Sequence, residues 1–131
     1  MPQSITTFLM FSGRAEEAMR FYTSLFPNSQ ILQMNTYGPE GPGKEGSVIH
    51  AIFTINNVPV MASDSPVQHA FSFTPSTSFF VQCTDAAEFE RVYAALAEEG
   101  MVLMPPNNYG FSTRFAWCND RFGVSWQINV P

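Results

Sequence analysis

The chain has 131 residues, a length that favours one domain over two. Its 11 acidic residues against 6 basic ones give a formal net charge of −5, so it lacks the basic surface that nucleic-acid binding normally requires. No apolar run approaches the roughly 18–20 residues that a membrane-spanning helix needs. Nucleic acid and membrane are therefore not expected partners.

Aromatic residues make up 15% of the chain and charged residues only 13%, against roughly 25% charged residues in an average domain. This composition suits a sizeable core and the lining of an apolar cavity. The first residues, MPQSITTF, lack the layout of a secretion signal, so we expect a cytoplasmic protein. There we expect Cys83 and Cys118 to be reduced, half-buried thiols, with a disulfide or a nucleophilic cysteine as the alternatives.

The first half of the chain is expected to form a strand, a helix and three further strands. Ser12 is a plausible N-cap of the helix and Pro27 ends it. The last two strands are joined by Asn56 and Asn57, a pair that tolerates the positive φ of a two-residue hairpin turn. The expected ranges are 5–11 for the first strand, 15–26 for the helix, and 29–37, 48–55 and 58–63 for the other strands.

After a polar connector, the same order of elements restarts. Asp85 and Glu88 resemble a capping box at the start of a second helix, which Gly100 ends. The expected strands are 77–83, 101–104, 111–118 and 124–130.

The restart is a repeat with a shift of 71 positions. Over the 18 positions from Phe8 to Leu25, six residues are identical to their shifted partners. Helical periodicity alone would not align exposed residues such as Glu17 with Glu88. The sequence therefore predicts an α+β fold of two tandem βαβββ modules within one domain, residues 1–131. Module one spans about 4–64, the connector about 65–76 and module two about 77–130.

Side-chain alternation predicts which residues line a cleft formed by the concave sheet faces. Leu9 and Phe11 should pack on the first helix. Pairing of the hairpin strands places His50 and Met61 on one face, and Arg114 is expected to take the place of His50 in the second module. The remaining cleft residues are expected to be Thr6, Phe8, Met10, Ile52, Thr54, Ser63, Thr77, Phe79, Val81, Ser125, Gln127 and Asn129.

Few side chains suggest chemistry. Residues 38–45 approach a phosphate-binding loop, but Glu45 stands where a hydroxyl residue is required. His50 could be a general base or a buried histidine satisfied by a neighbour. Arg114 could hold a carboxylate or enolate, or be an exposed strand arginine. Asp64 and His69 are expected in turns, and residues 119–123 in a hairpin loop.

The run FLMFSGRAEEAMRFY (residues 8–22), the following SLFP (24–27) and DRFGVSWQ (120–127) resemble the PhnB-like, demethylubiquinone methyltransferase-like branch of the vicinal oxygen chelate superfamily. The resemblance implies a glyoxalase-like fold, in which paired modules form a curved mixed sheet and a cleft for a small molecule, and it implies a homodimer. Metalloenzymes of the superfamily place ligands on the first and last strands of each module. The matching residues here are Thr6, Met61, Thr77 and Gln127, which are weak ligands, so we expect no metal and no other cofactor.

These observations favour a metal-free small-molecule-binding protein. The expected ligand-binding residues are Thr6, Phe8, Met61, Thr77, Phe79, Tyr109, Arg114, Trp117 and Gln127. One alternative is an enzyme, either a metal-independent isomerase or lyase with His50 as its catalytic base, or the methyltransferase that the family label suggests. Another is a dimeric scaffold whose cleft is filled.

Overall fold

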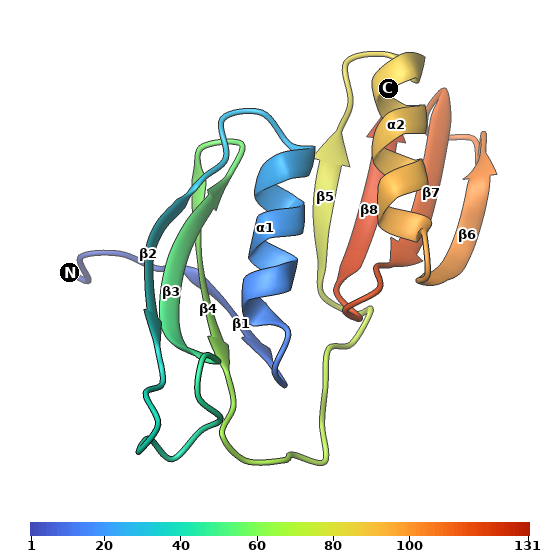
Figure 1. Cartoon of the computed structure of the whole chain (residues 1–131). Helices are drawn as coiled ribbons and strands as arrows, with labels where there is room; N and C mark the ends of the chain where they lie inside the picture. Colours follow the sequence, from blue (N-terminus) through green and yellow to red (C-terminus); the bar gives the residue numbers. More distant parts are fainter. The chain divides into compact units, whose positions relative to one another are not determined.

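A computed structural model describes all residues, 1–131 (Figure 1). The chain divides into two compact units, residues 1–70 (unit 1) and residues 71–131 (unit 2). Each unit has one helix and one four-stranded sheet. The division falls inside the connector expected from the sequence. Neither helix is long and apolar enough to cross a membrane.

In unit 1 the elements are β1 (Thr7–Phe11), α1 (Ala15–Leu25), β2 (Ile31–Thr36), β3 (Val48–Ile55) and β4 (Val58–Asp64). The strand order is β1-β4-β3-β2, with β1 parallel to β4 and the other pairs antiparallel. Unit 2 repeats this order with β5 (Ser78–Gln82), α2 (Ala86–Ala97), β6 (Met101–Asn107), β7 (Arg114–Asn119) and β8 (Ser125–Val130), arranged β5-β8-β7-β6. The predicted α+β fold of two tandem βαβββ modules is confirmed.

The core of unit 1 lies between α1 and one face of its sheet. Met19 and Tyr22 of α1 are fully buried, and the Tyr22 ring stacks on Phe53 of β3 with centroids 6.3 Å apart. Leu9 and Phe11 of β1 are buried on the same side, as alternation predicted. Each such side chain contributes roughly 1.5–3 kcal/mol of burial free energy.

The turn between β3 and β4 forms as expected. Asn56 and Asn57 have φ of 51° and 69°, the positive values that a tight hairpin turn requires. In the ladder Ile52 pairs with Met61, which is the predicted register. The faces of both strands are therefore fixed.

The two helices begin differently. Asp85 caps α2 by accepting a hydrogen bond from the Glu88 N–H at 2.8 Å, as predicted. Ser12 does not cap α1: the N-cap is Arg14, whose side chain makes no capping bond. The Asp64 carboxylate takes that role, because its Oδ1 accepts from the Gly13 and Ala15 N–H groups at 2.8 and 3.0 Å. Asp64 is thus more than a turn residue.

Strands β6 and β7 differ from their expected ranges. β6 continues through Pro105 and Pro106 to Asn107, whereas residues 111–113 lie outside β7. A proline removes a ladder donor and is tolerated on an edge strand. Because β6 is an edge strand of its sheet, the two prolines do not end it.

Candidate functional site

In each unit one face of the sheet packs on the helix, and we call the opposite one the helix-free face. On the helix-free face of unit 1, Phe8 of β1 pairs with Met61 of β4, which pairs with Ile52 of β3. His50 lies on the same face, with its ring centroid 6.3 Å from that of Phe8. The Phe8 side chain is 51% exposed. Thr6 lies just before β1 and is half-buried.

The His50 imidazole is half-buried and makes no hydrogen bond. The second alternative from the sequence, a buried histidine that is hydrogen-bonded to a neighbour, therefore does not apply. No carboxylate or carbonyl orients it, although such a partner usually accompanies a histidine base. Both ring nitrogens are free for a ligand.

In unit 2 the faces of the first strand, β5, are displaced by one residue from those that the repeat predicts. The repeat still applies to strands β2 and β6. The ladder of β2 is irregular between Ile31 and Gln33, and that of β6 is irregular 71 positions later, between Val102 and Met104. The shift of 71 does not apply to the first strand of each unit. The last buried residue before α1 is Phe11, four positions before the helix, whereas the last buried residue before α2 is Cys83, three positions before it. A slip of one residue moves every side chain of a strand to the other face.

Because of this slip, three expected cleft residues, Thr77, Phe79 and Val81, lie elsewhere, and Val81 pairs on the helix side with the buried Ile128. Phe79 lies on the helix side against Trp126, a fully buried core residue, with ring centroids 4.8 Å apart. Thr77 lies before β5 and is exposed. The aromatic residue of β5 on the helix-free face is Phe80, which is 56% exposed. The sequence reasoning missed Phe80, and the shorter strand-to-helix connection was the signal that could have found it.

Arg114 is also on the helix side of the sheet, so the expectation that it replaces His50 is wrong. Its Nε lies 2.9 Å from Glu90 Oε1, and its guanidinium carbon is 5.4 Å from the centre of the Phe89 ring. Both partners belong to α2. The predicted pair of His50 and Arg114 on matching faces therefore does not form.

Aromatic rings dominate the helix-free face of unit 2. Phe115 of β7 lies 6.4 Å from Phe80, 6.0 Å from Tyr109 and 5.0 Å from Phe111, measured between ring centroids. We call these four residues the aromatic cluster. Trp117 is on the same face, where it pairs in the ladder with Gln127. Tyr109, Trp117 and Gln127 were expected here, whereas Phe111 and Phe115 were not.

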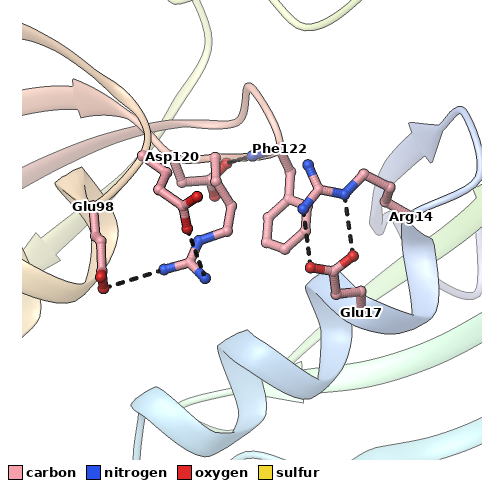
Figure 2. Close-up of polar contacts among 7 residues, drawn as sticks. Arg14, Glu17, Glu98, Asp120 and Phe122 are labelled. Atoms are coloured by element: carbon pink, nitrogen blue, oxygen red, sulfur yellow. Dashed lines mark hydrogen bonds and ion pairs between the residues drawn. The ribbon is translucent and has the colours of Figure 1, made fainter.

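The predicted hairpin loop at residues 119–123 is built around one carboxylate. Asp120 Oδ1 accepts a hydrogen bond from the Phe122 N–H at 2.8 Å (Figure 2). The same oxygen accepts from the Val124 N–H at 3.0 Å. Asp120 Oδ2 accepts from Trp126 Nε1 at 2.8 Å. The DRFGVSWQ motif thus contains a buried structural network in addition to Gln127.

The glycine-rich loop folds over an aromatic ring. A Cβ at Gly41 or Gly43 would lie 2.7 or 2.6 Å from the Tyr37 ring, so the loop packs closely on that side chain. These glycines have a packing role, and a strand follows them, with no helix to complete a nucleotide-type loop.

A hollow of about 610 Å³ lies beside this loop in unit 1. Its ionisable side chains are Arg14, Lys44, Glu45 and Asp64, two of each sign. Arg14 is paired with Glu17 at 2.9 Å (Figure 2), and both oxygens of Asp64 accept backbone hydrogen bonds. The hollow therefore has no clear charge preference.

Both cysteines are free and buried more deeply than the expected half-buried state. Burial, and next the charge of Glu88, raise the pKa of Cys83 to about 11. Burial and then the charge of Asp120 raise the pKa of Cys118 to about 12. A nucleophilic cysteine needs a lowered pKa and an accessible sulfur, so neither thiol fits that role.

The residues present do not suit the metal that the superfamily's enzymes use. No group of three His, Cys, Asp or Glu residues in the chain could hold an ion. The positions expected to match the superfamily's ligands hold Thr6, Met61, Thr77 and Gln127. Hydroxyl, thioether and neutral amide groups are weak ligands for a divalent transition metal.

The two tandem modules and their helix-free faces define a member of the vicinal oxygen chelate superfamily. The family model described as 3-demethylubiquinone-9 3-methyltransferase matches residues 3–129, and the chain belongs to this family. No curated protein matches the chain.

Solved structures agree with this family. The PhnB protein from Bacillus cereus is 53% identical, with 98% of this chain and 100% of that chain covered and a TM-score of 0.96. A protein from Pseudomonas aeruginosa is 30% identical over 98% of both chains, with a TM-score of 0.85. The fosfomycin resistance protein FosX from Mesorhizobium loti shares the fold alone, at 14% identity, 98% and 92% coverage and a TM-score of 0.61.

Proposed function

We propose that the protein binds a small aromatic molecule against a helix-free sheet face, without a metal ion. The observation that carries the proposal is the aromatic cluster of unit 2 with Trp117 beside it. Rings from two strands and one loop meet there, and Phe80 leaves 56% of its surface exposed. Binding sites for small molecules combine apolar and aromatic walls with a few polar groups, and Gln127 supplies such a group.

The helix-free face of unit 1 supports the same proposal. Phe8 is 51% exposed beside the half-buried His50 and Met61. Exposed apolar surface gathered in one place marks a binding surface more often than single scattered residues do. Phe8, Met61 and Thr6 therefore remain proposed ligand contacts, whereas the placement of Thr77, Phe79 and Arg114 argues against a direct contact from them.

The name of the family implies methyl transfer, which needs a methyl donor. The glycine-rich loop packs on Tyr37 and leads into a strand, so it does not supply a donor site of the nucleotide-binding type. No other segment of the chain suggests one. We therefore derive no transfer step, and saturable binding of a methyl donor in calorimetry would revive this alternative.

The second candidate function is metal-independent acid–base catalysis by His50. It is favoured by one observation: both imidazole nitrogens are unpartnered on a face that also carries an exposed Phe8. With any compound found to turn over, His50→Ala should abolish turnover and keep the melting temperature. Turnover unchanged in His50→Ala would reject the enzyme proposal.

The proposal includes a cytoplasmic location and a homodimer. Two buried free thiols are compatible with a reducing compartment. The exposed apolar residues Phe8, Phe80 and Phe111 leave surface for a second copy. Light scattering coupled to size exclusion should give twice the mass of one chain, and a single-chain mass over the micromolar range would reject the dimer.

A thermal-shift screen of aromatic compounds tests the binding proposal. A ligand that binds only the folded protein raises its melting temperature by mass action. Phe80→Ala should reduce the shift in melting temperature. Val58→Ala should not, because it removes an exposed apolar side chain that belongs neither to the aromatic cluster nor to the surface around Phe8 and His50. No shift across a broad library would reject the proposal and favour a scaffold.

A further inference from the structure

We infer that the helix-free face of unit 2 takes an uncharged, planar ligand that carries N–H or O–H donors. The inference rests on the proposed function and specifies its ligand class. It starts from the ladder, which places Phe80 and Gln82 of β5, Gln127 and Asn129 of β8, and Phe115 and Trp117 of β7 on this face. None of the strand residues on this face is Asp, Glu, Lys, Arg or His.

A face without charged side chains disfavours a charged ligand. An anion that leaves water must find a cation or several donors, or its desolvation opposes binding. The strand arginine that could have served, Arg114, is on the opposite side of the sheet, where it contacts Glu90 and Phe89. Because Arg114 is on the helix side, this face lacks the expected carboxylate site.

The amide groups on this face have unused acceptors. Asn129 is 7% exposed, and its Nδ2 donates to Gln82 Oε1 at 2.8 Å, but its buried Oδ1 has no partner. The Oδ1 of Asn119, on the same face, is likewise buried and unpartnered. A buried acceptor without a donor is unfavourable, and such groups usually have a water or ligand partner.

Gln127 lies between the aromatic side chains. It pairs with Phe80 in the ladder on one side and with Trp117 on the other. Its side chain is half-buried and makes no hydrogen bond. A primary amide between two aromatic residues can orient a planar molecule whose ring packs on them, since it both donates and accepts.

Three probes of similar shape test separately the two ligand properties, the absence of charge and the presence of N–H donors. Naphthalene-2-carboxamide is neutral and has N–H donors, its N,N-dimethyl form is neutral without donors, and 2-naphthoate is anionic. Titration into 15N-labelled protein, followed by NMR, gives each affinity and shows which signals move. The carboxamide should bind roughly tenfold more tightly than either of the others, the difference expected for one hydrogen bond to a buried acceptor. The side-chain signals of Gln127, Asn129 and Trp117 should move.

A lysine side chain introduced on this face should shift the preference from the neutral carboxamide to the anionic 2-naphthoate. Gln127→Lys, or Gln82→Lys at a more exposed position of the same face, should tighten binding of 2-naphthoate by roughly tenfold. Gln33→Lys is the matched control, because Gln33 pairs with Ile52 on the helix-free face of unit 1. It should leave the affinity for 2-naphthoate unchanged.

Other outcomes would overturn the inference in distinguishable ways. Equal or tighter binding of 2-naphthoate to the unmodified protein would refute the ligand class and leave the proposed function standing. Movement confined to signals around Phe8 and His50 would refute the assignment to unit 2. If none of the probes binds, the inference fails, and the library screen decides separately whether the proposed function fails with it.

Discussion

The carboxylate of Asp64, at the end of β4, accepts a hydrogen bond from the backbone N–H of Ala15, 49 residues earlier in the chain, at 3.0 Å. The same side chain accepts from Gly13 and from Val48, at the start of β3. One buried carboxylate therefore joins a helix start to two strands. The helix gains an acceptor for its free N–H groups and a negative charge at the positive end of its dipole.

Asp64→Ala should lower the free energy of unfolding by about 3 kcal/mol, because two buried N–H groups and a partly buried one lose their acceptor together. Asp85→Ala is the matched change at α2, where an exposed cap accepts one backbone bond, and it should lower the free energy of unfolding by about 1 kcal/mol. Urea denaturation of both variants measures the difference. Equal losses would contradict the joining role of Asp64.

Gly100 has no room for a side chain, since a Cβ there would overlap the backbone oxygen of Asn119. Gly100→Ala must move backbone and should lower the free energy of unfolding by about 2 kcal/mol or more. Gly38→Ala is the control, because nothing lies within 4 Å of its Cβ position. Its melting temperature should stay the same or rise slightly. An unchanged free energy of unfolding in Gly100→Ala would show that the backbone near Asn119 can move without loss of stability.

Neighbouring phenylalanines in β5 should respond in opposite ways. Phe79→Ala removes a ring packed on Trp126 and should lower the free energy of unfolding by about 3 kcal/mol. Phe80→Ala removes a mostly exposed ring and should cost less than about 1 kcal/mol. The second variant, and not the first, should weaken binding of naphthalene-2-carboxamide while the protein stays folded. The reverse pattern of stabilities would show that the faces of β5 are assigned wrongly.

The raised pKa values of the thiols predict both reactivity and pH dependence. At pH 8 neither Cys83 nor Cys118 should react with a thiol reagent in the native protein, and both should react in urea. The unfolded thiols have an ordinary pKa near 9, whereas burial raises the folded values to about 11 and 12. The folded state therefore retains protons that the unfolded state releases, so stability should be complete below pH 9 and fall as the pH rises through 11.

Removing one thiol provides the control for that prediction. Cys118→Ala should make the loss of stability above pH 9 less steep, because one fewer proton is released on unfolding. Chemical denaturation at several pH values measures the slope. Rapid labelling of either cysteine in the native protein at pH 8 would contradict its burial.

The helices, the hairpin and the duplication could be predicted because they depend on local patterns. The apolar period of α1, the Asn56-Asn57 turn and the cap at Asp85 each reflect the conformational preferences of a few neighbouring residues. Alternation likewise places Ser125, Gln127 and Asn129 opposite Trp126 and Ile128, and the ladder confirms this placement.

The site was harder to predict, because a face depends on register across distant strands. Copying Phe8 onto Phe79 was reasonable for the helices, but the connection before α2 is one residue shorter. That change reversed the face of β5 and brought Phe80 to the position expected for Phe79. The capping role of Asp64 was also invisible, because its donors lie 16 to 51 residues away.

The amino-acid sequence thus determined the kind, order and repetition of the elements, since those follow from short-range preferences and from the spacing of apolar side chains. Only the tertiary structure decided which aromatic and amide groups share a face, and that Arg114 is not among them. The physical reason is that strand pairing and helix packing place the residues of a sheet face together from distant parts of the chain, and a difference of one residue in a connection changes that set.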